Sequence, residues 1–240
     1  MTETIYAGSY WGARKESAEA CALRMERLFA SLANVDPGFA QWFQQGRSRK
    51  AALQRPIEPR GPALEALIRR GRDRVFEDLG FRVRGWNGVT DDHDASGFDV
   101  TCGGYAQAVN NFCVFSLPTQ GPHAERVLTA PILGGIVRSM ATAWEPEWAI
   151  ATSSAHRDLV TENPKPGTFV GWVMYLARSR GSVPPLPAPV RIEPVEDKGT
   201  LLILTPERFT VSNPEHVALA EHVRGLLENS GLMKPLTQAA

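Results

Sequence analysis

The sequence contains few cysteines: Cys21, Cys102 and Cys113 lie far apart, and no CxxC pair occurs. This pattern provides neither the paired spacing of a zinc site nor the cysteine density of a small disulfide-stapled domain. Cys21 falls on the apolar stripe of an expected helix, and the other two fall in strand-like runs. We therefore expect buried, reduced thiols and a reducing compartment.

The chain also lacks an excess of either charge, with 26 Lys plus Arg and 26 Asp plus Glu. A general nucleic-acid-binding protein usually has a basic excess, so we expect no nucleic-acid partner. No apolar run approaches membrane-spanning length. The stretch MTETIYAGSYWG does not combine a basic segment with an apolar one, as a signal peptide would. We expect a cytoplasmic protein that does not contact a membrane.

The common catalytic signatures are missing as well: no GxSxG, Walker A, strand-associated GxGxxG or HExxH motif is present. The stretch SSAHRD (153–158) brings serine, histidine and aspartate together, but catalytic triads assemble from distant segments, so we interpret it as a loop. His216 and His222 are six positions apart on one expected helix and point to different faces. We expect His123 and His156 at the surface. The sequence therefore predicts neither a catalytic centre nor a cofactor.

Hydrophobic periodicity supplies the positive information about the fold. Helical spacing of apolar residues predicts helices over 15–33, 129–144 and from Pro214 onward, and a proline-started helix from 62 to about 74. A short helical piece is expected to carry Trp42 and Phe43. Alternating or continuous apolar runs predict strands, which lie at 6–10, 81–89, 97–103, 108–117, 148–152, 168–177, 190–195 and 200–205.

Short connections between these strands favour antiparallel pairing. The run 168–177 is apolar on both faces, which is typical of a central strand. In the helix over 129–144, Thr129 is expected as the N-cap, and Gly134 and Gly135 should weaken the helix unless close packing requires them. The expected fold class is α+β, in which N-terminal, central and C-terminal helices flank a mainly antiparallel sheet. We expect one domain over residues 1–240.

The run DDHDASGFD (91–99) is the sharpest candidate for chemistry. Asp91, His93, Asp94 and Asp99 offer the oxygen and nitrogen donors that a metal-dependent hydrolase would use. The plainer interpretation is a solvated hairpin tip, since aspartate and glycine are common in turns. A third hypothesis is an acidic loop that contacts a basic partner.

Two other residue classes have both a structural and a functional interpretation. The basic runs RSRK (47–50) and RRGRDR (69–74) contain no interleaved aromatic residues, so we interpret them as solvated faces. Trp172 is expected in the core. The remaining tryptophans fall at element ends, where they either cover the core or anchor a protein interface; they are Trp11, Trp42, Trp86, Trp144 and Trp148.

The segments YAGSYWGARKESAEACALR and DPGFAQWFQQGRSRKAAL resemble the start of the Immunity protein 52 family. The resemblance covers residues 4 to about 54, with weaker agreement at GRDRVFEDLGFRVRGWNG (71–88). It implies an α+β fold without a catalytic centre. It also implies that the chain is the cognate inhibitor of a polymorphic toxin, such as a type VI secretion effector. Toxins encoded beside this family often resemble nucleases with a restriction-endonuclease fold.

A nuclease cleft that binds phosphate is usually electropositive, so an inhibitor that plugs it should present carboxylates. The densest carboxylate run is Asp91, Asp92 and Asp94, close to Trp86, and we expect these residues to bind the partner. Trp11 and Arg14 belong to the opening segment that carries the resemblance. They either contact the toxin or lock the first strand against the first helix.

The sequence therefore predicts a stoichiometric toxin inhibitor and not an enzyme, with its oligomeric state left open. One alternative is the metal-dependent hydrolase built on Asp91, His93, Asp94 and Asp99. The other is an effector adaptor or chaperone, which would bind the effector and leave its toxicity intact.

Overall fold

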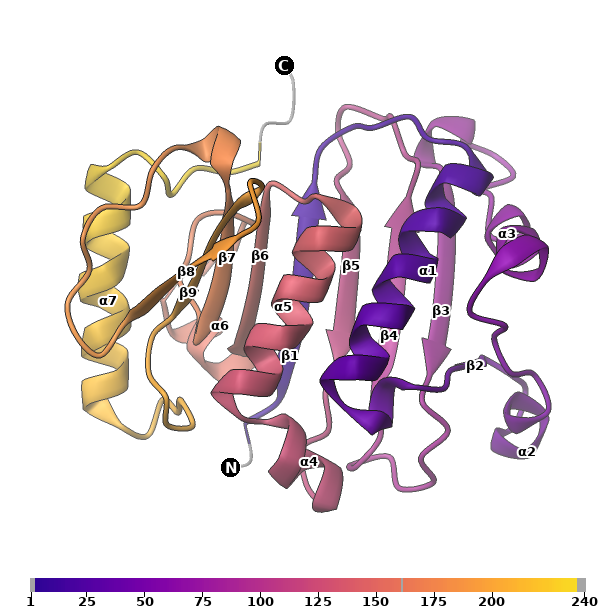
Figure 1. The fold of residues 1–240 in the computed structure, drawn as a ribbon, viewed down its shortest axis with the longest axis horizontal. Helices are drawn as coiled ribbons and strands as arrows, with labels where there is room; N and C mark the ends of the chain where they lie inside the picture. The colour runs from indigo at the N-terminus through magenta and orange to yellow at the C-terminus, as the bar shows by residue number, and fades with distance from the viewer. Residues whose placement is uncertain (1–2, 161, 237–240) are drawn as a thin grey trace.

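The computed structural model describes residues 3–160 and 162–236. Its centre is a nine-stranded antiparallel sheet with the strand order β2-β3-β4-β5-β1-β6-β7-β9-β8 (Figure 1). The strands are β1 (Ile5–Trp11), β2 (Phe43–Gln44), β3 (Phe81–Trp86), β4 (Gly97–Cys102), β5 (Asn111–Ser116), β6 (Trp148–Ser153), β7 (Val173–Ala177), β8 (Arg191–Val195) and β9 (Gly199–Ile203). The strand predicted over 168–177 is central, because β7 lies between β6 and β9, but it covers only 173–177, and residues 168–172 are not part of a strand.

Helices flank this sheet, which confirms the α+β class. They are α1 (Ala18–Val35), α2 (Arg49–Leu53), α3 (Gly61–Arg70), α4 (Pro122–Val127), α5 (Ala130–Trp144), α6 (Ser154–Val160) and α7 (Pro214–Asn229). Short 3-10 turns occur at Pro37–Phe39, Glu77–Leu79 and Arg178–Arg180. Helices α1 and α5 cross the same face of the sheet and contact each other (Figure 1). Among the described residues, no helix combines the length and apolar character needed to cross a bilayer.

The N-terminal strand and helix follow the predicted pattern closely. Ile5, Ala7 and Trp11 are buried on the helix-covered side of β1, while Tyr6 and Tyr10 are half-buried on the other side. Helix α1 begins after Ser17, whose side chain accepts a hydrogen bond from the Ala20 N–H (3.1 Å), as an N-cap does. The three cysteines are buried and free, as expected.

Close packing explains the glycine pair in α5. A Cβ atom at Gly135 would lie 2.9 Å from Cγ1 of Val35, at the end of α1, so the absence of a side chain lets the two helices approach. At Gly134 the nearest atom would be 3.5 Å away, on Ile203. Thr129 occupies the N-cap position, but its side chain makes no capping hydrogen bond, contrary to expectation.

Several local predictions were wrong for reasons of tertiary packing. Trp42 and Phe43 do not lie on a helix: Trp42 packs against the rings of Phe29, Phe39 and Phe98, and Phe43 begins β2. The helix that begins near Pro62 ends at Arg70 and not near 74, since Gly71 docks on β3.

The stretch 153–158 is not a loop, because Ser154 begins helix α6. His156 is 0% exposed and was wrongly expected at the surface. Its Nε2 lies 3.1 Å from the carbonyl oxygen of Val170, and its ring packs edge-on against Phe209.

The second face of the sheet is open over β3, β4 and β5. There the outward side chains are half-buried or exposed, whereas the alternate positions are buried except for the half-buried Phe81. Arg82 and Arg84 of β3, Asp99 of β4 and Val114 of β5 lie on this open face. The open face meets the edge of the sheet at β3, where the candidate site lies.

Candidate functional site: two hollows along the β3 edge

Two hollows lie side by side along β3, of which the two-residue edge strand β2 covers only the end, and Gln45 lines both. The smaller one has a volume of about 360 Å³ and contains Trp86 and Asp92. The larger one, which we call the arginine groove, has a volume of about 580 Å³. Both volumes are in the range of ligand-binding clefts.

Trp86 ends β3, and its ring is half-buried against Phe43 of the neighbouring strand, with the ring centroids 6.3 Å apart. Across the smaller hollow, Arg49 of α2 donates a hydrogen bond to the carboxylate of Asp92 (2.5 Å). Both side chains are exposed, so this ion pair adds little stability and can exchange for a partner's charges. Trp86 and Asp92 therefore lie together, as the sequence predicted.

Asp91 and Asp94 have different surroundings in the same turn. Asp91 is exposed and accepts a hydrogen bond from the His93 N–H (2.9 Å). Asp94 is only 6% exposed and accepts hydrogen bonds from the backbone N–H groups of His123 (2.9 Å) and Ala124 (3.1 Å). Its second oxygen lies 2.7 Å from Nδ1 of His123. Asp94 thus fixes the acidic turn to α4.

The pKa of Asp94 reflects this position. Burial raises it, but the hydrogen bonds from His123 and Ala124 outweigh burial and hold the pKa below its ordinary value. The carboxylate therefore stays ionised and structural. Because it is buried, we leave Asp94 out of the contact surface proposed below.

The donors expected for a metal ion are not brought together. Asp94 is directed toward His123, and Asp99 lies on β4 between Arg82 and Arg84. Within residues 3–160 and 162–236, no group of three or more His, Cys, Asp or Glu side chains is arranged to hold a metal. The described residues therefore contain no ligand set for the hypothesis of a metal-dependent hydrolase, which was based on Asp91, His93, Asp94 and Asp99.

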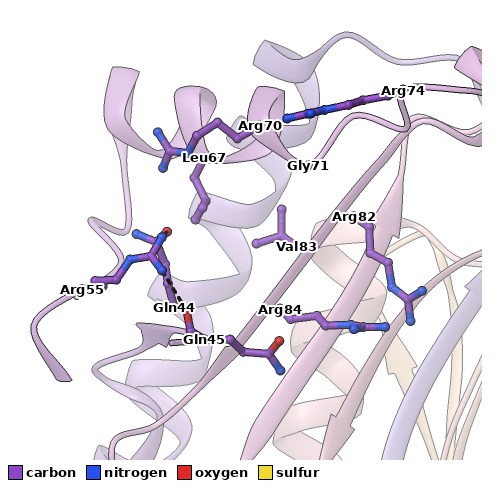
Figure 2. A pocket seen from close by; sticks show the side chains of 10 residues that line it. All are labelled: Gln44, Gln45, Arg55, Leu67, Arg70, Gly71, Arg74, Arg82, Val83 and Arg84. Carbon is purple, nitrogen blue, oxygen red and sulfur yellow. Dashed lines mark hydrogen bonds between the residues drawn. The ribbon is translucent and has the colours of Figure 1, made fainter. Parts of the chain in front are cut away.

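The arginine groove brings together side chains from four segments (Figure 2). Its lining is Gln44, Gln45, Arg55, Leu67, Arg70, Gly71, Arg74, Arg82, Val83 and Arg84. Figure 2 shows Leu67 and Val83 between Arg70 of α3 and the arginines of β3. Five guanidinium groups and no carboxylate therefore surround a small aliphatic floor.

Two local features create this groove. Gly71 accepts a hydrogen bond from the Arg82 N–H (2.8 Å), and a Cβ atom there would collide with the Arg82 carbonyl oxygen. Only glycine lets the end of α3 approach β3 so closely. Gln44 pairs with Gly85 and Arg72 bridges to Phe81, so among the described residues no strand continues the sheet beside Val83.

The guanidinium groups differ in how their charge is balanced. Arg82 and Arg84 both pair with Asp99, at 2.6 and 2.9 Å. Burial raises the pKa of Asp99, but its hydrogen bonds with these arginines outweigh burial and lower the pKa below its ordinary value. Arg55 donates to the side-chain oxygen of Gln44 (3.1 Å). Arg70 and Arg74 are exposed and form no ion pair with any residue that the structure describes.

Trp11 and Arg14 have structural contacts in the helix-covered layer. Trp11 is 2% exposed and stacks on Trp144 at 5.3 Å between ring centroids. Arg14 lies over Trp11 and donates to the carbonyl oxygens of Trp144 (2.8 Å) and Glu145 (3.5 Å), which end α5. These contacts hold the end of β1 against α5, whereas the structural role expected from the sequence was a lock between the first strand and the first helix.

Sequence reasoning missed the arginine groove. The run RRGRDR (69–74) was interpreted as a solvated face, yet Arg70 and Arg74 line the groove. The usable signal was the exposed alternation of Arg82 and Arg84 in an expected strand close after that basic run. The sequence alone does not reveal the hydrogen bond between Gly71 and Arg82 that joins the two segments.

Comparisons with known proteins agree with this fold. A family model described as Immunity protein 52 matches residues 3–236. Among solved structures, the Pseudomonas aeruginosa T6SS protein PA0821 is similar with a TM-score of 0.57 and 14% sequence identity. The similarity covers 93% of this chain and 72% of that one, and at this identity it shows the fold alone. A search of curated proteins found no match.

Proposed function

Because the chain belongs to the Immunity protein 52 family, we propose that it binds and neutralises a cognate secreted bacterial toxin in a tight stoichiometric complex. The family consists of immunity proteins of secreted toxin systems. The single observation that carries the proposal is the family match over residues 3–236, which is nearly the whole chain.

We further propose that the toxin is a type VI secretion effector with a restriction-endonuclease-like nuclease domain, and that the complex forms in the cytoplasm. The type VI assignment is supported by the fold shared with a P. aeruginosa T6SS protein. The nuclease assignment is supported by the chemistry of the acidic turn. Exposed carboxylates suit an electropositive cleft that binds phosphates.

The proposed contact surface is the smaller hollow with Asp91, Asp92 and Trp86. Asp91 and Asp92 are exposed and would accelerate association with a basic surface. Trp86 is half-buried at the rim, where an aromatic side chain can supply much of the affinity. On binding, Asp92 would exchange Arg49 for a basic group of the toxin.

Co-expression with the toxin encoded beside this gene tests the function. We expect the protein to restore growth of a bacterial host that makes the toxin, and the purified pair to bind with a Kd of about 1 nM or lower. If the two proteins bind but the toxin stays active, the chain is an adaptor or chaperone and the proposal is wrong. Failure to bind any neighbouring toxin also contradicts it.

A double charge reversal tests the contact surface. Asp91→Lys with Asp92→Lys should slow association by about tenfold or more at low salt, because steering by rim charges acts on the association rate. Asp197→Lys with Glu207→Lys is the matched control, since both residues are exposed elsewhere on the chain. Equal association rates for the two variants would exclude the acidic turn as the contact.

A further inference from the structure

The arginine groove concentrates positive charge on a chain whose total charge is zero. Five guanidinium groups line it, and Asp99, which lies outside the lining, balances part of the charge on Arg82 and Arg84. Arg70 and Arg74 have no carboxylate partner among the described residues. An anionic ligand could therefore pair with Arg70 and Arg74 without first breaking an ion pair within the protein.

We propose that the arginine groove binds an acidic, extended segment of the partner protein, whose carboxylates pair with Arg70 and Arg74. This inference rests on the function proposed above, because it identifies a second contact of the same toxin. Guanidinium groups suit this role, since their planar forks bind carboxylates through two parallel hydrogen bonds.

The shape of the site favours a polypeptide over nucleic acid. The lining contains no aromatic side chain on which a base could stack, and its floor is the aliphatic pair Leu67 and Val83. The side-chain amides of Gln44 and Gln45 can both donate to and accept from a peptide backbone. The groove also lies at a gap in the sheet edge beside Val83 and Arg84, between the pairing of Gln44 with Gly85 and the hydrogen bond of Arg82 to Gly71.

Two exposed apolar residues directly follow Arg74 of the groove in the chain. Val75 and Phe76, which directly follow Arg74, are 79% and 61% exposed. Both backbone N–H groups donate to the carboxylate of Asp73, at 2.9 and 2.7 Å, which orders the turn that presents them. The turn therefore presents an aromatic side chain to solvent two positions after Arg74, and both residue types are enriched at protein interfaces.

The first test uses the free protein and a fluorescent oligoglutamate peptide, followed by anisotropy at low salt. We expect binding that Arg70→Glu with Arg74→Glu weakens by about tenfold or more. The control is Arg27→Glu with Lys165→Glu, which changes the net charge equally at exposed positions outside the groove. No binding, or equal binding by both variants, overturns the proposal. Stronger binding of a single-stranded oligonucleotide through the same arginines also overturns it.

The second test measures toxin affinity for the same variants. We expect the groove variant to lose about tenfold or more in affinity while the control keeps the wild-type value. A groove variant with wild-type affinity overturns the inference and leaves the proposed function standing. A wild-type protein that binds no toxin contradicts the proposed function instead, and the peptide experiment then still decides whether the groove is an acidic-peptide site.

Discussion

Arg14 donates a hydrogen bond through Nη2 to the carbonyl oxygen of Trp144, 130 positions later in the chain, at 2.8 Å. The bond satisfies a carbonyl at the end of α5 that has no partner within the helix. We therefore predict that Arg14→Ala lowers the free energy of unfolding by about 1 to 3 kcal/mol and leaves toxin affinity unchanged. Urea denaturation and a binding titration measure the two effects. A stable variant that loses affinity would instead make Arg14 a direct contact.

Replacing each of the two glycines of α5 with alanine should change the stability of the protein in opposite directions. Gly134→Ala gains helix propensity and meets only ordinary contacts, so we expect stability to rise by up to about 1 kcal/mol. Gly135→Ala places its Cβ against the stiff side chain of Val35 and should lower stability by about 1 kcal/mol or more. Thermal unfolding of both variants gives the signs. If Gly135→Ala were also stabilising, Val35 would have to move aside freely, which would contradict the close packing of α1 and α5.

Stability should fall in mild acid because of His156. Burial lowers the pKa of His156 below its ordinary value of 6.5, and the hydrogen bond to Val170 does not compensate. Below about pH 6.5 the unfolded chain therefore binds a proton that the folded protein resists, so acidification favours unfolding. The free energy of unfolding should drop between about pH 7 and pH 5.5, and His156→Gln should reduce that drop. The control variant His222→Gln, at an exposed position, should show the same drop in the free energy of unfolding as the wild type.

Two carboxylates of the acidic turn, Asp94 and Asp92, should contribute unequally to the stability of the protein. Asp94→Ala removes a buried acceptor of two backbone N–H groups and should cost about 1 to 3 kcal/mol. Asp92→Ala removes only an exposed ion pair and should cost at most about 1 kcal/mol. Thermal midpoints of the two variants give the comparison. Equal destabilisation would mean that Asp94 does not anchor the turn to α4.

Much of the fold was predictable because its signals are local. The alternation of buried and half-buried residues in 97–102 and 111–116, and the apolar stripe of α1, each lie within one element. Those patterns specify which face is buried whatever the distant partner is. The Asn213 cap of α7 was likewise visible, since a cap and its helix are adjacent.

The site was less predictable because pairing between distant segments builds it. Asp94 and Asp92 look alike in the sequence, and only the position of His123 separates the buried anchor from the exposed charge. The arginine groove depends on Gly71 meeting Arg82. The sequence predicts His156 at the surface because its neighbours in the chain are polar. In the structure, the backbone of Val170 and the ring of Phe209 enclose it.

The position of β1 has a consequence for how the protein is made. Tyr6 pairs with Ser116 on one side and with Thr152 on the other, so the strand synthesised first lies between two strands synthesised much later. At ordinary translation rates, roughly 5 to 20 seconds pass before β5 leaves the ribosome. During that interval β1 has no neighbour and exposes Ile5 and Trp11, side chains that end in the core. Assembly of the sheet around β1 is therefore held back until the middle of the chain has left the ribosome.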